Sequence, residues 1–267
     1  PLYLLADTAI VGHLGTVQLA SLALAALILG AVVNLLNFLA YGTTARVARL
    51  VGGGEQQQAD RLGVQAVWLA LGIGSLVALL SVALAGPLMD VLAGDPGPVA
   101  DGAARYLRIS AAGLPCALIA VAAQGYLRGI AELRTALLVV IAANVVNVAL
   151  ELLFVYGFDW GLDGSALGTV VAQFGMAAAF VIVIVRRARS VAPPHRRAIA
   201  SLLQLGAPIV IRTGALLASF LTAGAVLARV GPDSLGAHQV AFQLFIFLAL
   251  VLDALAIAAQ VLVGQAL

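Results

Sequence analysis

The chain has few charged residues, and this scarcity excludes a soluble globular protein. Only 10% of its 267 residues are charged, while 63% are hydrophobic and the mean hydropathy is +1.10. A soluble protein needs more polar surface than this composition supplies. The formal net charge of +2 is also too small to indicate nucleic-acid binding.

Other absences narrow the function further. The single cysteine, Cys116, lies in an apolar segment, so an intrachain disulfide is impossible and a redox role is not expected. The sequence has no zinc-ligand spacing and no nucleophile motif. The run Gly52-Gly53-Gly54 lacks the Lys and the Ser or Thr of a phosphate-binding loop. We therefore expect no cofactor, no metal site and no enzymatic activity.

What the chain does contain is a series of long apolar stretches. A helix needs about 20 mostly apolar residues to cross a bilayer. We predict an all-α, polytopic membrane protein, with a six-helix bundle followed by the first two helices of a second lobe. Clusters of Gly or Pro separate the predicted helices, which are residues 1–12, 17–48, 61–93, 99–130, 134–156, 163–188, 199–229 and 234–265.

The domain boundaries follow from these breaks. We predict an N-terminal lobe over 1–190, a linker over 191–198 that contains Pro193-Pro194, and the start of a C-terminal lobe over 199–267. The first helix has about half the length needed to span, and the eighth runs to Leu267 with no loop after it. We expect the chain to be a fragment of a longer protein.

The distribution of charge predicts the orientation. Arg residues flank the even-numbered connections, and Asp residues lie in the odd-numbered ones, although Arg105, Arg108 and Arg229 depart from this pattern. Because cytoplasmic loops are enriched in positive charge, we expect the even-numbered loops of a multi-pass cell-membrane protein to be cytoplasmic.

Two acids interrupt the apolar helices. Asp7 and Glu151 both lie within predicted spans, where a charge is costly and is usually retained for function. Both are expected in the outer half of the membrane, at similar depth. In a shared pocket, desolvation and the neighbouring acid would favour the neutral form. We expect this pair to take up a proton on one side of the membrane and release it on the other.

Polar residues repeat along two of the helices. Asn144 and Asn147 share one helix face with Glu151, and Asn34, Asn37 and Tyr41 repeat the same spacing in the second helix. We expect these side chains to line a water-filled pocket with the two acids. The alternative for each Asn is a hydrogen bond between helices.

A deep Arg and Asp occur in the last two helices. Arg212 and Asp253 both lie well inside predicted spans. We expect them to form a buried ion pair, and we favour this structural role over a substrate-binding role.

Several short segments of the chain form a recognisable series of motifs. The segments are Asp7 to Gly15, Gly125 to Gly129 followed by Arg134-Thr135, Asn147 to Glu151, Gly161 to Gly164, Thr169 to Gln173, Ala237 to Ala241, and Asp253 to Gly264. In order and spacing they resemble the first, fourth, fifth, sixth and eighth helices of the multidrug and toxic compound extrusion (MATE) family, especially its DinF-like branch.

The resemblance implies twelve helices in two lobes and the export of drugs or organic cations, driven by H⁺ or Na⁺. Asp7 matches the family's first-helix carboxylate, and Asn147 and Glu151 match an Asn and an Asp of the fifth helix. Gln173 joins the expected cavity residues. The implied partners are a small-molecule substrate, H⁺ (or Na⁺) and the lipid bilayer. We expect a monomer that binds no nucleic acid.

The chain also departs from the family pattern. Residue 151 is Glu where Asp is usual, and Ala131-Glu132-Leu133 stands where Gly-Asp-Thr is common. The seventh helix carries Arg212 and no acid, whereas some Na⁺-coupled members have a Glu there. These differences favour proton coupling through the first lobe.

Three alternatives remain open. A flippase for lipid-linked precursors would use a cationic cavity, but Arg212 is the only deep Arg. A Na⁺-coupled exporter is a second alternative. The third is an intramembrane enzyme or a scaffold that does not transport; the Gly-x-Gly-Asp context of an intramembrane protease is absent, and buried acids argue against a scaffold.

Overall fold

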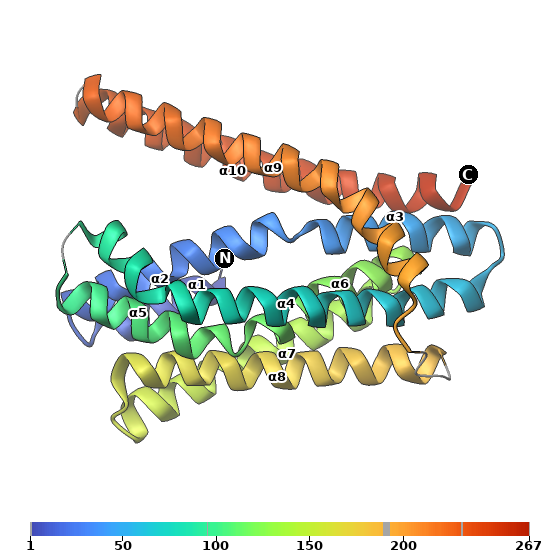
Figure 1. Cartoon of the computed structure of the whole chain (residues 1–267), viewed down its shortest axis with the longest axis horizontal. Helices are drawn as coiled ribbons and strands as arrows, with labels where there is room; N and C mark the ends of the chain where they lie inside the picture. Colours follow the sequence, from blue (N-terminus) through green and yellow to red (C-terminus); the bar gives the residue numbers. More distant parts are fainter. Residues whose placement is uncertain (1, 95, 189–192, 231, 267) are drawn as a thin grey trace.

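The predicted all-α fold is confirmed. A computed structural model describes residues 2–94, 96–188, 193–230 and 232–266, and long helices account for nearly all of them (Figure 1). The elements are α1 (Leu2–Gly12), α2 (Thr16–Leu35), α3 (Phe38–Gly52), α4 (Gln56–Ala93), α5 (Pro98–Ala111), α6 (Leu114–Gly129), α7 (Leu133–Leu152), the π-turn η1 (Leu153–Gly157), α8 (Gly161–Ala188), α9 (Arg196–Val230) and α10 (Pro232–Ala266).

Most of these helices are long and apolar enough to cross a bilayer. Five segments meet that description within the described residues: Thr16–Gly52, Gln56–Ala93, Leu133–Gly157, Gly161–Ala188 and Ala198–Phe220. The bent pair α5 and α6 makes a sixth. The multi-span prediction is therefore confirmed.

Two predicted helices are broken near their midpoints. The helix predicted over 17–48 divides at Leu36 and Asn37, and the helix predicted over 99–130 divides at Ala112 and Gly113 with a bend of 54°. Pro115 follows the second break and has no N–H to continue the helical hydrogen bonds. By contrast, Pro87 and Pro208 lie inside the continuous helices α4 and α9.

The core of the bundle is built by close helix contacts. The Gly125 and Gly129 pair on α6 faces α3, where an added Cβ at Gly125 would come within 2.5 Å of the Ala40 carbonyl oxygen. Thr44 Oγ1 donates a hydrogen bond of 3.0 Å to the Gly125 carbonyl across this contact. Small residues thus let two backbones approach, as expected where lipid provides no hydrophobic drive for helix association.

Helices α9 and α10 lie side by side along one flank of the bundle. They contact α3 along its length, from Phe38 beside Gly206 to Ala48 beside Gly264, and diverge from the bundle toward the opposite end (Figure 1). Gln65 on α4 fixes the connection to α9, because its amide donates to the Pro193 carbonyl at 3.0 Å and accepts from the His195 N–H at 2.6 Å. Part of the predicted linker, residues 191 and 192, lies outside the described residues.

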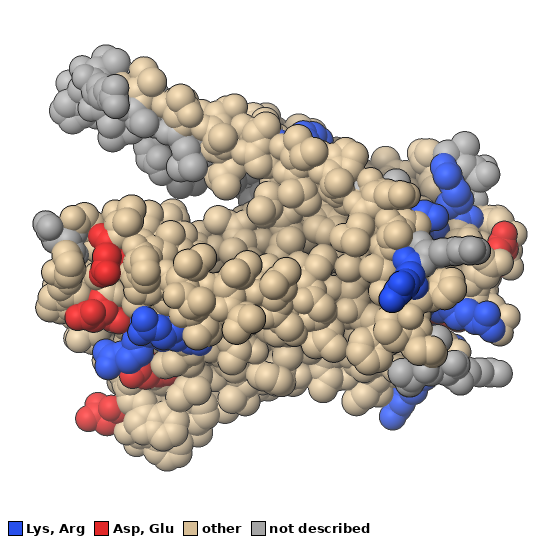
Figure 2. Space-filling view, viewed as in Figure 1, with Lys and Arg blue, Asp and Glu red and all other residues tan. Residues whose placement is uncertain are grey.

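Charged side chains separate toward the two ends of the molecule. Arg residues occupy the last turns of α3, α6 and α8, and these three helices end together (Figures 1 and 2). Carboxylates gather mainly at the opposite end, where Arg105 forms an ion pair with Asp163 at 3.2 Å. At the Arg-rich end, Arg187 pairs with Glu132.

Candidate functional site: a buried acid cluster

The structure brings Asp7 and Glu151 into contact. Asp7 lies on α1, and Glu151 lies at the end of α7, just before the π-turn η1. Their carboxyl groups lie close enough for the charge of each to act on the other. Both are buried, with exposed fractions of 2% for Asp7 and 0% for Glu151. Burying two neighbouring carboxyl groups away from water costs free energy unless they share a proton.

Hydroxyl and amide groups surround Glu151. Its Oε1 accepts hydrogen bonds of 3.2 Å from Ser165 Oγ and 3.2 Å from Thr169 Oγ1, both on α8. Thr169 Oγ1 in turn accepts one of 3.3 Å from the Asn147 amide. Ser165 and Thr169 are four residues apart and thus lie on one face of α8. The network therefore joins α7 to α8 through neutral groups.

Tyr106 on α5 completes the cluster. Its side chain is 3% exposed, lies beside Ser165 and Thr169, and is close enough to Asp7 and Glu151 for their charges to act on it. Four helices, α1, α5, α7 and α8, thus contribute to one buried polar site.

Local structure positions the two acids. Gly168 lies directly beneath Glu151, and an added Cβ there would come within 3.1 Å of the Glu151 Cγ. Beyond Glu151 the chain forms the π-turn, a distortion common at functional sites. Tyr156, in this turn, donates a hydrogen bond of 2.8 Å to the Ile10 carbonyl near the end of α1. Helix ends leave carbonyls unpaired, so this contact fixes α1 against η1.

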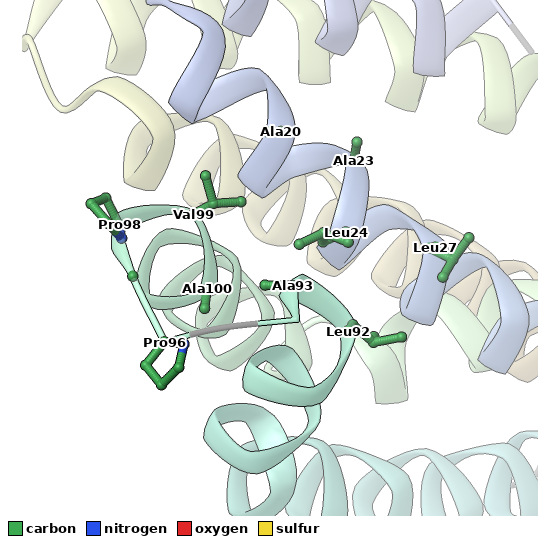
Figure 3. Close-up of a pocket in the computed structure, with 11 residues that line it drawn as sticks. Ala20, Ala23, Leu24, Leu27, Leu92, Ala93, Pro96, Pro98, Val99 and Ala100 are labelled. Carbon is green, nitrogen blue, oxygen red and sulfur yellow. The ribbon is translucent and has the colours of Figure 1, made fainter.

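The acid cluster is packed, which differs from the water-filled pocket expected from the sequence. Two pockets of the described region lie elsewhere. A groove of about 730 Å³ runs between α2 and the α4–α5 connection and is lined by apolar or small residues, including Leu24, Leu27 and Pro98 (Figure 3). A cavity of about 230 Å³ lies between α4, α6 and α8. Neither is lined by the predicted site residues.

The structure assigns different environments to the other predicted cavity residues. Asn147 is buried in the cluster, but Asn144, one turn earlier on α7, is exposed. Asn34 is also exposed and donates to the Gly30 carbonyl of its own helix. Asn37 lies in the break before α3, and Gln173 points at the break between α5 and α6. Thus Asn144 and Asn34 do not join the acids as expected.

A second polar contact links α3 to α10. Tyr41 Oη donates a hydrogen bond of 3.1 Å to Asp253 Oδ1, and the Gln260 amide donates one of 3.0 Å to the Tyr41 carbonyl. The expected Arg212–Asp253 ion pair is wrong for this structure, because Asp253 is paired with Tyr41 and Arg212 is exposed. Arg212 remains close enough to Tyr41 to act on it through charge.

Three residues of the acid cluster were missed from the sequence: Tyr106, Ser165 and Thr169. The spacing of Ser165, Thr169 and Gln173 by four residues was the available signal, because it places three polar side chains along one face of an apolar helix. Within the described residues, no three His, Cys, Asp or Glu side chains come together in a metal-binding arrangement.

These features define a multi-span helical membrane protein with a carboxyl pair buried inside its bundle. The MatE family model matches residues 1–153, and the chain belongs to this family. The chain is 30% identical to DNA damage-inducible protein F of Escherichia coli over 100% of its own length and 60% of that protein. It is also 30% identical to Protein DETOXIFICATION 44, chloroplastic, of Arabidopsis thaliana, over 99% of its own length and 53% of that protein.

Solved structures share the fold. The Vibrio cholerae MATE transporter VcmN in its bent form matches with a TM-score of 0.85 and 24% identity, over 98% of this chain and 61% of that one. An outward-facing multidrug resistance MATE family transporter matches with a TM-score of 0.84 and 20% identity, over 99% of this chain and 59% of that one. The chain thus spans a little over half the length of these relatives.

Proposed function

We propose that this chain is part of a secondary active transporter that exports amphipathic or cationic small molecules in exchange for protons. The contact between Asp7 and Glu151 is the observation that carries this proposal. Intramembrane carboxyl groups are costly and typically mark proton or ion pathways. Neutral hydroxyl groups of Ser165 and Thr169 bond to the Glu151 carboxyl, and the Asn147 amide bonds to Thr169.

The names of the relatives support the substrate class. A similar protein of Thermotoga maritima, 23% identical over 90% of this chain, is named a probable multidrug resistance protein. The name of the outward-facing structure likewise describes multidrug resistance. By extension, we assign a transport role rather than an enzymatic one to the full-length protein.

The buried pair provides a chemical switch. With one proton between them, one carboxyl can donate a hydrogen bond to the other, and the contact between α1 and α7 is stable. Without the proton, two carboxylates repel each other in a medium of low dielectric constant. The hydrogen bonds from Ser165 and Thr169 hold Glu151 against α8, so the displaced element is α1, which carries Asp7. Proton binding therefore biases a two-state helix arrangement.

The same proposal includes the arrangement of the lobes. Residues 1–190 form the proton-binding lobe, 191–198 the linker and 199–267 the beginning of the second lobe, in a monomer. The Arg-rich end of the bundle faces the cytoplasm, in accordance with the positive-inside rule. The α3–α10 contact through Tyr41 and Asp253 then joins the two lobes inside the membrane, in their cytoplasmic halves.

Export by the full-length protein in sealed vesicles tests this function. A fluorescent organic cation is loaded, and its release is followed under an imposed pH gradient or, separately, an imposed Na⁺ gradient. We expect the pH gradient alone to drive export. Export driven by Na⁺ at uniform pH would instead support the Na⁺-coupled alternative, and no gradient-driven export would contradict a transport role.

A further inference from the structure

The polar stripe on α8 continues beyond the acid cluster. Gln173 lies one helical turn after Thr169, and Ser110 lies one turn after Tyr106 on the adjacent α5. Both helices run in the same direction from the end where Arg105 pairs with Asp163. Ser110 and Gln173 therefore form the next polar layer, about 6 Å deeper at four residues of 1.5 Å each.

This layer coincides with the break between α5 and α6. The Gln173 amide oxygen lies against Gly113, where an added Cβ would overlap it. At the break, backbone N–H groups bond to the carbonyl three residues earlier. Ala112 N–H donates to the Ile109 carbonyl at 3.1 Å, and Gly113 N–H donates to the Ser110 carbonyl at 3.0 Å. Pro115 follows and has no N–H, so it cannot donate the helical bond that the Ala111 carbonyl would otherwise accept.

Two buried oxygens at this layer have no hydrogen-bond partner within the protein. They are Ser110 Oγ, on a side chain that is 5% exposed, and Gln173 Oε1. A buried polar atom without a partner is strongly destabilising. Both atoms lie beside a helix break, where Pro115 cannot donate to the Ala111 carbonyl, so one small hydrogen-bonding molecule at the break would satisfy more than one of these groups.

We propose that the α5–α6 break binds one ordered water molecule through Ser110 Oγ, Gln173 Oε1 and the Ala111 carbonyl. Three protein partners are typical of a buried water. No carboxylate of the described residues contacts these oxygens, which favours a neutral ligand over a metal cation.

The water extends the hydrogen-bond network of the acid cluster one turn deeper into the lobe. The water lies beside Ser110, one helical turn beyond the Tyr106–Thr169 layer, and serves as a relay for protons that reach or leave the Asp7–Glu151 pair. This relay role rests on the proposed function, whereas the water site itself does not. Ser110 and Gln173 act as positioning residues, because they hold the water rather than the exchanged proton.

Thermal unfolding of the purified full-length protein tests the water site. Replacing a truly orphaned polar group with an apolar one is neutral or stabilising, whereas removing a ligand of a bound water is destabilising. We expect Ser110→Ala and Gln173→Met each to lower the unfolding midpoint by about 2 °C. Because both variants lose the same water, the double variant should lose little more than the larger single loss. An unchanged or raised midpoint in either single variant, or losses that add, would overturn the site.

Export under a pH gradient tests the relay. We expect Ser110→Ala and Gln173→Met to slow proton-driven export several-fold. Ser21→Ala is the matched control, since it removes a buried hydroxyl that bonds to the Val17 and Val99 carbonyls outside this network, and it should leave the rate unchanged. If both relay variants export at the wild-type rate while Asp7→Asn is inactive, the relay is wrong and the proposed function stands. If the wild type ignores the pH gradient, the function itself is wrong.

Discussion

Thr169 on α8 donates a hydrogen bond of 3.2 Å to the Glu151 carboxyl on α7 and accepts another, of 3.3 Å, from the Asn147 amide. Its hydroxyl therefore bonds to two polar side chains of α7, whereas the Ser165 hydroxyl bonds to one, the Glu151 carboxyl. Thr169→Val should cost about 2–3 kcal/mol of stability, against about 1 kcal/mol for Ser165→Ala. Equilibrium unfolding of the two variants in detergent provides the comparison.

Both substitutions keep the local volume nearly constant, so cavity formation does not explain a difference between them. Equal losses would mean that Asn147 finds another acceptor, and the network as described would then be incorrect. The order of the two losses is thus more informative than either value.

A second prediction concerns the contact between α6 and α3. Gly125→Ala should be destabilising by several kcal/mol, because the added Cβ would lie 2.5 Å from the Ala40 carbonyl oxygen and force the helices apart. Gly72→Ala, in the middle of α4 with no atom within 4 Å of the new Cβ, is the matched control. It should stabilise the helix by up to about 1 kcal/mol. Unfolding midpoints that shift in the same direction would contradict the close approach.

A third prediction concerns the end of α6. Ala131 has a φ of 60°, in the left-handed region that glycine favours, and the Glu132 N–H bonds to the Leu127 carbonyl at 2.8 Å as in a helix-ending motif. Ala131→Gly should therefore stabilise the protein by about 1 kcal/mol. Ala136→Gly, inside α7, should be destabilising by a similar amount. A loss of stability in Ala131→Gly would show that this backbone conformation is wrong.

The positions of the helices were predictable from the sequence, for reasons the structure makes clear. Long apolar runs separated by Gly and Pro locate the spans. The bend at Gly113 lies beside Pro115, and a Pro inside an apolar run indicates a kink in the helix. The division at Asn37 was not predicted, because Leu36 and Asn37 carry no Pro or Gly signal and the apolar pattern continues through them.

The faces of the helices were harder to predict. In a membrane protein, both the lipid-facing and the buried side of a helix are apolar, so hydrophobic periodicity does not reveal which side faces inward. This is why Asn144 and Asn34 were placed with the acids although both are exposed. Tyr106, Ser165 and Thr169 were overlooked because hydroxyl side chains in apolar helices often bond to their own backbone. The acids were found because a buried charge has few structural explanations.

The most direct test of the central claim is the rate of proton-driven export by Asp7→Asn in the full-length protein. Asn keeps the size of the side chain and cannot exchange a proton, so we predict that export under a pH gradient is abolished while membrane insertion and the unfolding midpoint stay close to those of the wild type. Glu151→Gln, whose partners Ser165 and Thr169 can still bond to the amide oxygen, should impair export less. Wild-type export by Asp7→Asn under the same gradient would contradict proton coupling through the acid pair.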